Sequence, residues 1–110
     1  MKLVIAFIRQ EQLPAVKQAL FNAQIRHFTA MMVVGTAPNT EQQMYRGEAR
    51  EVSLFNRIRL EVAAKDSQVE TVIKAISEGS MESGGWGRIM VTPINEMVKI
   101  WTGERGNLAF

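Results

Sequence analysis

The hydrophobic residues near the start of the chain follow two different spacings. Residues 2–9 are almost continuously apolar and rich in branched and aromatic side chains, which predicts a largely buried strand. Over residues 11–24 the spacing becomes helical, because Leu13, Val16 and Leu20 recur every three or four positions. The chain is therefore expected to begin with a strand followed by a helix.

Two more strands are predicted on either side of a long connection. Strand character returns from Phe28 to Gly35, and from Phe55 to Ala64 aliphatic residues alternate with charged ones, as in a half-exposed strand. Between them, residues 36–54 carry Pro38, Gly47, several amides and mixed charge without a helical or a strand period. Such long connections are uncommon in a small domain and are usually functional.

The second half of the chain predicts a helix and two short strands. Ser67 and Glu70 form a capping-box signature, and the helix that follows can be terminated by Gly79. The apolar positions of this helix are Val69, Val72, Ile73 and Ile76. After a glycine-rich stretch, the apolar run Ile89–Val91 predicts a strand. A last short strand is expected near Met97–Thr102, followed by a polar tail.

This order of elements predicts an α+β fold of the ferredoxin-like βαββαβ type, with a long loop between the second and third strands. In this sandwich two helices cover one face of an antiparallel sheet. The other face is left for solvent or for association with another chain. With 110 residues, the chain is expected to form a single domain, residues 1–110, without a linker.

Composition narrows the class of protein. Apolar residues make up 46% and charged residues 22%, as in an ordinary folded protein. The net charge is only +2 and the basic residues are scattered, so no nucleic-acid partner is expected. The lack of cysteine excludes disulfides and thiolate metal sites. No apolar run suits a signal peptide or approaches the roughly 20 residues of a membrane span, so we expect a soluble, cytoplasmic protein.

The strongest candidate for ligand chemistry is the glycine cluster at Gly84, Gly85 and Gly87, which is followed by Arg88. Glycine lets backbone amides approach an anion closely, and a guanidinium adds positive charge. The cluster is not a Walker loop, because no Gly-Lys-Ser/Thr triplet follows it. Taken alone, its spacing leaves phosphate binding and an ordinary tight turn both open.

Other polar residues point less clearly to a function. Arg57 and Arg59 stand on the polar face of a strand, where solvation or ion pairing across the sheet is the simplest interpretation. Glu61 can accept a hydrogen bond from a ligand or face solvent. His27 is the single histidine, so neither a catalytic relay nor a multi-histidine metal site can be assembled. We therefore expect no metal site and no enzymatic activity.

Several short stretches, taken together, resemble the PII nitrogen-regulatory family of signal transduction proteins over the whole chain. The stretches are Met1–Arg9, Val16–Leu20, Tyr45-Arg46-Gly47, Gly85–Ile89 and Thr102–Gly106. Each stretch is short, and the weight of the resemblance lies in their order and spacing. The ending is the most specific of them.

The resemblance implies a homotrimeric regulator that binds an adenine nucleotide in clefts between its subunits. The long connection, residues 36–54, would be a protruding loop that docks into a target enzyme or a membrane transporter, to which the protein would be recruited. The partner-binding residues of this loop would be Tyr45, Arg46, Gly47 and Arg50.

The resemblance also implies which residues line the nucleotide cleft. The residues around the base would be Phe7, Thr29, Gly35, Glu61 and Ala63. The residues near the phosphates would be Gly85, Gly87, Arg88 and Lys99. The resemblance implies ATP or ADP as the ligand, and glycine amides and two cations do complement a polyphosphate.

The chain also departs from the pattern of the family. Arg50 stands where some members carry a tyrosine that is uridylylated, so no uridylylation is expected. Arg57 replaces a lysine that contacts 2-oxoglutarate, and a glutamine that helps hold magnesium has no secure counterpart, so the resemblance gives little support for either ligand. Trp86 replaces an acidic residue and Trp101 a late arginine, which makes AMP an alternative to ATP or ADP.

Two functions from different classes follow from these residues. The leading hypothesis is a regulator that responds to an adenine nucleotide. The alternative, motivated by Trp86 and Trp101, is a trimeric interaction module that has lost ligand control. An acyl-phosphate hydrolase or an RNA-binding sheet fits less well, because no nucleophile can be assembled and residues 55–64 carry aliphatic side chains and arginines instead of stacking aromatics.

Overall fold

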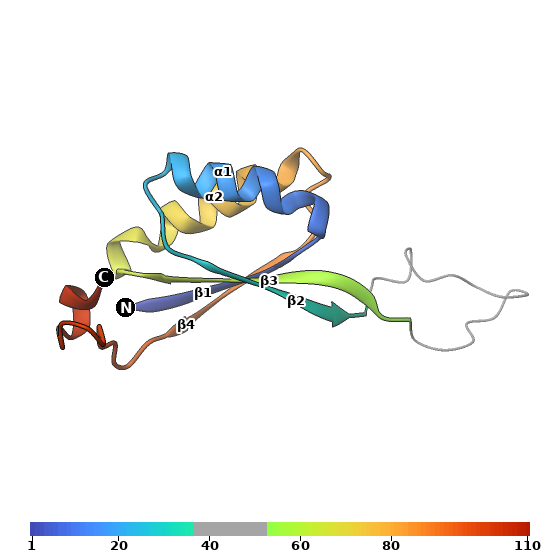
Figure 1. Cartoon of the computed structure of the whole chain (residues 1–110). Coiled ribbons are helices and arrows are strands. Elements are labelled where there is room, and N and C mark those ends of the chain that lie inside the picture. Colours follow the sequence, from blue (N-terminus) through green and yellow to red (C-terminus); the bar gives the residue numbers. More distant parts are fainter. Residues whose placement is uncertain (37–52) are drawn as a thin grey trace, which may run out of the picture.

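The computed structural model describes residues 1–36 and 53–110. Its helices and strands follow the order β1 (Lys2–Ile8), α1 (Leu13–Asn22), β2 (Thr29–Gly35), β3 (Phe55–Ala64), α2 (Val69–Met81) and β4 (Arg88–Pro93). The two helices form one layer and the strands form another (Figure 1). The predicted α+β, ferredoxin-like βαββαβ fold is confirmed.

The strands form one antiparallel sheet in the order β2-β3-β1-β4. β1 and β3 are therefore the central strands, and β2 and β4 form the edges. Pro93 ends β4 on an edge, where a strand tolerates a residue without a backbone N–H group. The alternating pattern from Phe55 to Ala64 predicted the bounds of β3 correctly.

The hydrophobic core lies between the helices and one face of the sheet. Because side chains alternate along a strand, Val4, Ala6 and Ile8 of β1 share the face that the helices cover. The other buried core residues are Val16, Leu20, Ile25, Ile58, Leu60, Val62, Ala64, Val72, Ala75 and Ile76. Neither described helix is long and apolar enough to cross a membrane.

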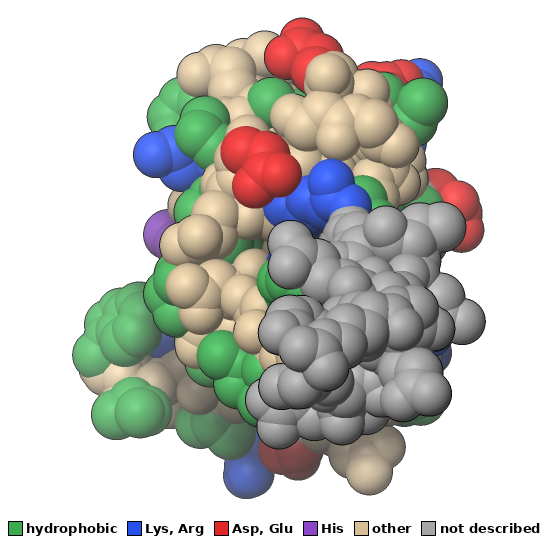
Figure 2. Space-filling model, turned by 90° about the vertical axis from the view of Figure 1, so that its right-hand side faces the viewer, with side chains coloured by type: hydrophobic (Ala, Val, Ile, Leu, Met, Phe, Trp, Pro, Cys, Tyr) green, Lys and Arg blue, Asp and Glu red, His purple; other side chains and the backbone are tan. Residues whose placement is uncertain are grey.

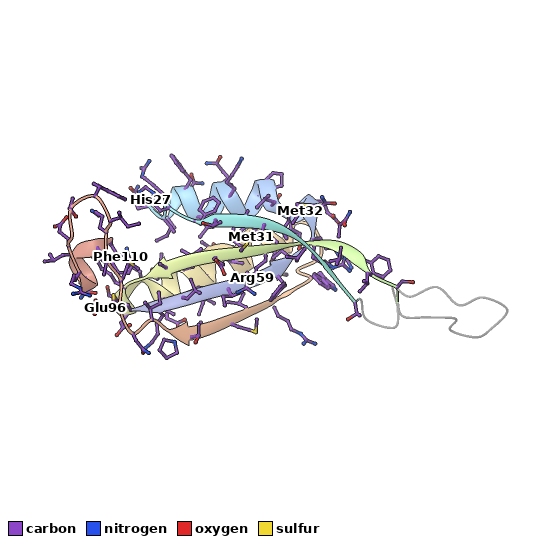
Figure 3. The ribbon with its side chains drawn as sticks, turned by 60° about the horizontal axis from the view of Figure 1, so that its bottom comes forward. His27, Met31, Met32, Arg59, Glu96 and Phe110 are labelled. Atoms are coloured by element: carbon purple, nitrogen blue, oxygen red, sulfur yellow. The ribbon has the colours of Figure 1, made fainter. Side chains whose placement is uncertain are left out.

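The opposite face of the sheet has no helix over it in the described part of the chain (Figures 1 and 3). Half-buried Leu3, Ile5 and Phe7 of β1 lie on this open face. Near its middle, Arg59 Nη2 lies 3.0 Å from Glu61 Oε2, so Arg59 is ion-paired, but within β3 and not across the sheet as expected. The open face is thus a mixture of aliphatic, aromatic and paired charged side chains.

Both helices follow a short 3-10 turn that ends in a glutamine. Gln12 Oε1 accepts a hydrogen bond from the Arg9 N–H group at 2.7 Å, and Gln68 Oε1 accepts one from the Lys65 N–H group at 3.1 Å. The prediction that Ser67 caps the second helix is therefore wrong, because Gln68 satisfies the preceding backbone donor instead. The first helix likewise begins at residue 13 and not at residue 11.

Gly79 does not end α2, contrary to the prediction. The helix continues to Met81, and Gly79 is buried where α2 contacts α1. A Cβ atom at this position would lie 2.6 Å from the Cα atom of Val16 and 2.9 Å from its nitrogen. The glycine is needed because two helix backbones approach closely, and not because the helix has to stop.

The strand predicted at Met97–Thr102 is also wrong. Val98 and Arg105 form an isolated bridge, and a tight turn connects them. Within the predicted strand, Ile100 is 92% exposed and Trp101 is 81% exposed. Residues 98–105 therefore form a turn that exposes the two large apolar side chains of Ile100 and Trp101. We call these residues the C-terminal turn.

The helix contact gives a first testable prediction. Gly79→Ala should lower the free energy of unfolding by about 1–3 kcal/mol, because the added methyl group meets backbone atoms that cannot rotate away. The gain in helix propensity, at most about 1 kcal/mol, does not offset this. Ser77→Ala, at an exposed position of the same helix, is the control and should change it by less than about 0.5 kcal/mol. Urea unfolding of both variants measures the difference, and equal values would contradict the prediction.

Candidate functional site

A cavity of about 810 Å³ opens at the end of the sheet where β2 ends and β3 begins. All four strands and the loop 82–87 after α2 contribute residues to its walls. Its lining residues are Phe7, Val33, Val34, Gly35, Thr36, Arg57, Gly85, Trp86, Gly87, Arg88 and Met90. Figure 2 views the molecule from this end, where basic and hydrophobic side chains lie close together.

The residues predicted to contact a ligand divide into two groups. Those that line the cavity, which we call the cavity group, are Phe7, Gly35, Arg57, Gly85, Gly87 and Arg88. Those that do not line it, which we call the distal group, are Thr29, Glu61, Ala63 and Lys99. The structure thus brings together the predicted glycine segment and the ends of three strands, but it does not bring the whole predicted set to one place.

The distal group lies further along the open face and on the C-terminal turn. Thr29 of β2 pairs with Glu61 of β3 in the antiparallel register. Lys99 lies on the C-terminal turn, where its Nζ atom is 3.8 Å from Glu104 Oε1 and 5.5 Å from the ring centroid of Trp101. In this structure, Lys99 is therefore paired with a carboxylate and does not line the cavity.

The conformation of the loop 82–87, which we call the glycine loop, is determined first by the end of α2. Gly84 N–H donates to the Met81 carbonyl at 3.1 Å, and Gly85 N–H donates to the Ser80 carbonyl at 2.9 Å. These bonds close the helix in the manner of a Schellman motif, in which Gly84 takes the required positive φ angle, 89°; Gly85 also has a positive φ angle, 66°. The amides of Gly84 and Gly85 are thus occupied, which leaves the following amides, of Trp86 and Gly87, as the candidates for contact with an anion.

Gly87 brings this loop against the end of β1. Its φ angle is 134°, and a Cβ atom there would lie 2.3 Å from the carbonyl oxygen of Phe7. No side chain fits at such a distance. Gly87 therefore fixes how closely the loop approaches the strand, and it determines where the neighbouring Trp86 enters the cavity.

Gln12 is a buried polar residue that ties the surroundings of the site together. Its side-chain amide donates to the Ser80 carbonyl at 3.3 Å, and its oxygen accepts the bond from Arg9 N–H. Ser80 is the same residue that accepts the bond from Gly85. Gln12 therefore joins the end of β1 to the base of the glycine loop, a role that the sequence analysis did not identify.

Trp86 lies against two arginines at the wall of the cavity. The Cζ atom of Arg57 is 4.4 Å from the ring centroid of Trp86, and that of Arg9 is 5.3 Å from it. Arg57 also lies 5.3 Å from the ring centroid of Phe55 and is only 7% exposed. The interpretation of Arg57 as a solvated surface residue is therefore wrong, because its guanidinium is buried among aromatic rings.

Arg88 differs from Arg57 in its exposure. It is the first residue of β4, faces Phe7 across the β1–β4 ladder, and is exposed at the cavity wall. An exposed guanidinium beside the amides of a glycine loop suits a phosphate group. The apolar side of the cavity is formed by residues that the sequence analysis did not name as site residues, namely Val33, Val34 and Met90.

A signal for part of this apolar wall was present in the sequence. Val33 is two positions before Gly35, and Met90 two positions after Arg88, so both share a strand face with a residue that was predicted. The predicted partner-binding residues Tyr45, Arg46, Gly47 and Arg50 lie outside the described residues.

Comparison with known proteins settles the family. Residues 1–104 match the family described as Nitrogen regulatory protein P-II. The chain belongs to this family. It is 36% identical over 110 residues to nitrogen regulatory protein GlnK1 of Methanosarcina mazei, with 96% of this chain and 94% of that protein covered. It is 35% identical over 111 residues to nitrogen regulatory protein P-II of Microchaete diplosiphon, with 99% of each covered.

Membership of the P-II family establishes the general kind of function. The matched proteins are named as nitrogen regulatory proteins, and one of them, from Azospirillum brasilense, is 35% identical over 108 residues. The predicted resemblance is therefore confirmed, and the chain is a signal transduction regulator and not an enzyme.

The glycine loop of this P-II family member gives a second testable prediction. Gly87→Ala should be more destabilising than Gly84→Ala by about 1–3 kcal/mol, because only Gly87 has a backbone atom in the path of the added methyl group. Gly84 is the matched control, since it also has a positive φ angle but nothing within 4 Å of its Cβ position. Unfolding in urea measures both values. A similar loss in the two variants would mean that backbone strain alone, and not the approach to Phe7, requires the glycine.

Proposed function

We propose that the protein is a homotrimeric regulator that binds an adenine nucleotide in clefts between its subunits and thereby controls a target enzyme or transporter. The observation that carries the proposal is the division of the predicted ligand residues into a cavity group and a distal group. The two groups are complementary in chemistry, yet each is incomplete alone. A cleft between two copies of the chain would unite them.

The cavity group suits one end of a nucleotide. Arg88 and the amides of Trp86 and Gly87 can bind phosphate oxygens, while Val33 and Met90 provide apolar contact for a base or ribose. A cavity of about 810 Å³ lies within the range of about 300–1,000 Å³ found for small-molecule sites.

The distal group provides what the cavity lacks. Thr29 and Glu61 offer hydrogen-bonding groups that can recognise a base, and Lys99 offers a second cation for the phosphates. Lys99 would have to exchange its exposed partner Glu104 for the ligand, which is inexpensive because pairs of this kind are weak.

Two surfaces support association through unlike patches on each subunit. The open sheet face carries half-buried aliphatic residues, and the C-terminal turn carries the exposed side chains of Ile100 and Trp101. When a patch at one end of a subunit meets a different patch on the next, the contacts close into a ring if the rotation permits. A trimer is the ring that the resemblance implies, and its expected mass is about 37 kDa, three times 12.4 kDa.

ATP and ADP are the ligands that we propose first, with AMP as the alternative. Control of the partner would be exerted through residues 36–54, as the resemblance implies. Calorimetric titration with each nucleotide provides the direct test. If none of the nucleotides binds, the nucleotide-dependent function is rejected and the ligand-independent interaction module becomes the better description.

A mixing experiment tests whether the site is shared between subunits. Arg88→Ala and Lys99→Ala should each weaken nucleotide binding at least tenfold, because each removes one cation from the phosphate site. When the two variants are unfolded together and refolded at equal concentrations, about one quarter of the clefts should combine an intact cavity group with an intact distal group. That fraction should bind ADP with wild-type affinity.

One result of the same titrations would contradict the proposal of a shared site. If mixed Arg88→Ala and Lys99→Ala protein binds no better than either variant alone, although size-exclusion chromatography shows mixed trimers, the two residues do not meet across a subunit boundary. Refolded wild-type protein is the control for recovery after unfolding.

A further inference from the structure

We propose that Trp86 determines which anions the cavity accepts, because it withdraws the guanidinium of Arg57 from ligand binding. The cavity would then bind one phosphate-bearing ligand at Arg88 and would exclude a second, carboxylate-bearing ligand at Arg57. The proposal rests on the proposed nucleotide site and adds that this site responds to the nucleotide alone.

The contacts of Arg57 show why it is a poor ligand group. Its Cζ atom lies over the rings of both Trp86, at 4.4 Å, and Phe55, at 5.3 Å, and its Nη1 atom donates to the Asn56 carbonyl at 3.0 Å. Only 7% of the residue is exposed. A carboxylate bound in the usual two-pronged manner would need a free edge of the guanidinium, which is reached here only by displacing these neighbours.

The loop holds Trp86 in this position. Gly85 and Gly87, on either side of it, have φ angles of 66° and 134° that other residues rarely adopt. Gly87 lies so close to β1 that a Cβ atom there would be 2.3 Å from the Phe7 carbonyl oxygen. The Gly85 N–H group donates a hydrogen bond to the Ser80 carbonyl at 2.9 Å. The backbone on both sides of Trp86 is therefore fixed, so the ring cannot leave Arg57 by a simple shift of the loop.

Of the two arginines that line the cavity in the described residues, Arg88 is better placed than Arg57 to bind an anion. Arg88 is exposed, whereas Arg57 is buried beneath aromatic rings. Arg59, the next arginine on the same strand face, is engaged by Glu61 at 3.0 Å. Among the described arginines of β3 and β4, Arg88 is thus the one presented to an incoming anion, which favours a single anionic group over two.

The test compares dicarboxylate binding with and without the indole ring. Wild-type protein, Trp86→Ala and Trp86→Phe are titrated calorimetrically with 2-oxoglutarate and with succinate at constant ionic strength, each with and without saturating ADP. Trp86→Ala should bind at least one of the dicarboxylates at least tenfold more tightly than wild type. Trp86→Phe should stay close to wild type, because a phenyl ring still covers the guanidinium.

Two further variants assign the effect to Arg57. The double variant Trp86→Ala/Arg57→Met should lose the gained binding. Phe21→Ala is the matched control, because Arg26 lies 4.4 Å from the ring centroid of Phe21 on the outside of the molecule, so a contact of the same length is removed away from the cavity. It should gain no dicarboxylate binding. Far-UV circular dichroism and size-exclusion chromatography verify that every variant is folded.

Three outcomes would overturn the proposal. Wild-type protein could bind a dicarboxylate as tightly as Trp86→Ala, folded Trp86→Ala could gain no binding, or the gain could survive in the double variant. The titrations without ADP keep this result separate from the proposed function. If no nucleotide binds, the proposed function fails, while the dicarboxylate measurements still decide whether Trp86 masks Arg57.

Discussion

The structure depends on one constraint, which is that the two central strands must bury one row of side chains beneath two helices. Val4, Ala6 and Ile8 of β1 occupy the buried row, and the alternation of a strand sends their neighbours to the opposite face. A shift of one residue in register would expose the entire core. The open face is therefore fixed as firmly as the core, although no helix covers it in the described chain.

The candidate site follows from this constraint. Every predicted ligand residue on a strand shares the open face, and these residues are Phe7, Thr29, Gly35, Arg57, Glu61, Ala63 and Arg88. The rows of β1 and β3 that face the helices leave no room for a ligand, because their core residues from Val4 to Ile8 and from Ile58 to Ala64 are almost fully buried. The proposed ligand site and the proposed contact between subunits would thus use the same surface, which is the physical reason for proposing a site shared between subunits.

The sequence predicted best what depends on local patterns. The alternation of aliphatic and charged residues predicted β3 at its true bounds, and the glycines before Arg88 marked the loop beside the cavity. The sequence predicted poorly what depends on distant contacts. Gly79 resembles a helix terminator in sequence, but its role comes from the approach of a second helix, and the burial of Arg57 depends on a tryptophan 29 positions later.

The strand predicted at Met97–Thr102 was wrong for a related reason. A run of apolar residues forms a strand only when neighbours bury it, and Ile100 is 92% exposed in this structure. A domain of 110 residues buries a limited fraction of its surface, so side chains of this size remain available for contact with another chain, as the proposed trimer requires.

A ligand held between subunits would couple two equilibria. A nucleotide that binds only the assembled protein stabilises the assembly by RT ln(1 + [L]/Kd), about 2.7 kcal/mol at a hundredfold excess over Kd. The open face, the C-terminal turn and the glycine loop would then all contribute to the stability of the assembly, because each would form part of the contact between subunits at which the nucleotide binds. In the proposed assembly Trp86 would strengthen this coupling, because Arg57 is covered by its ring and the site between subunits would then respond to one kind of ligand and not to two.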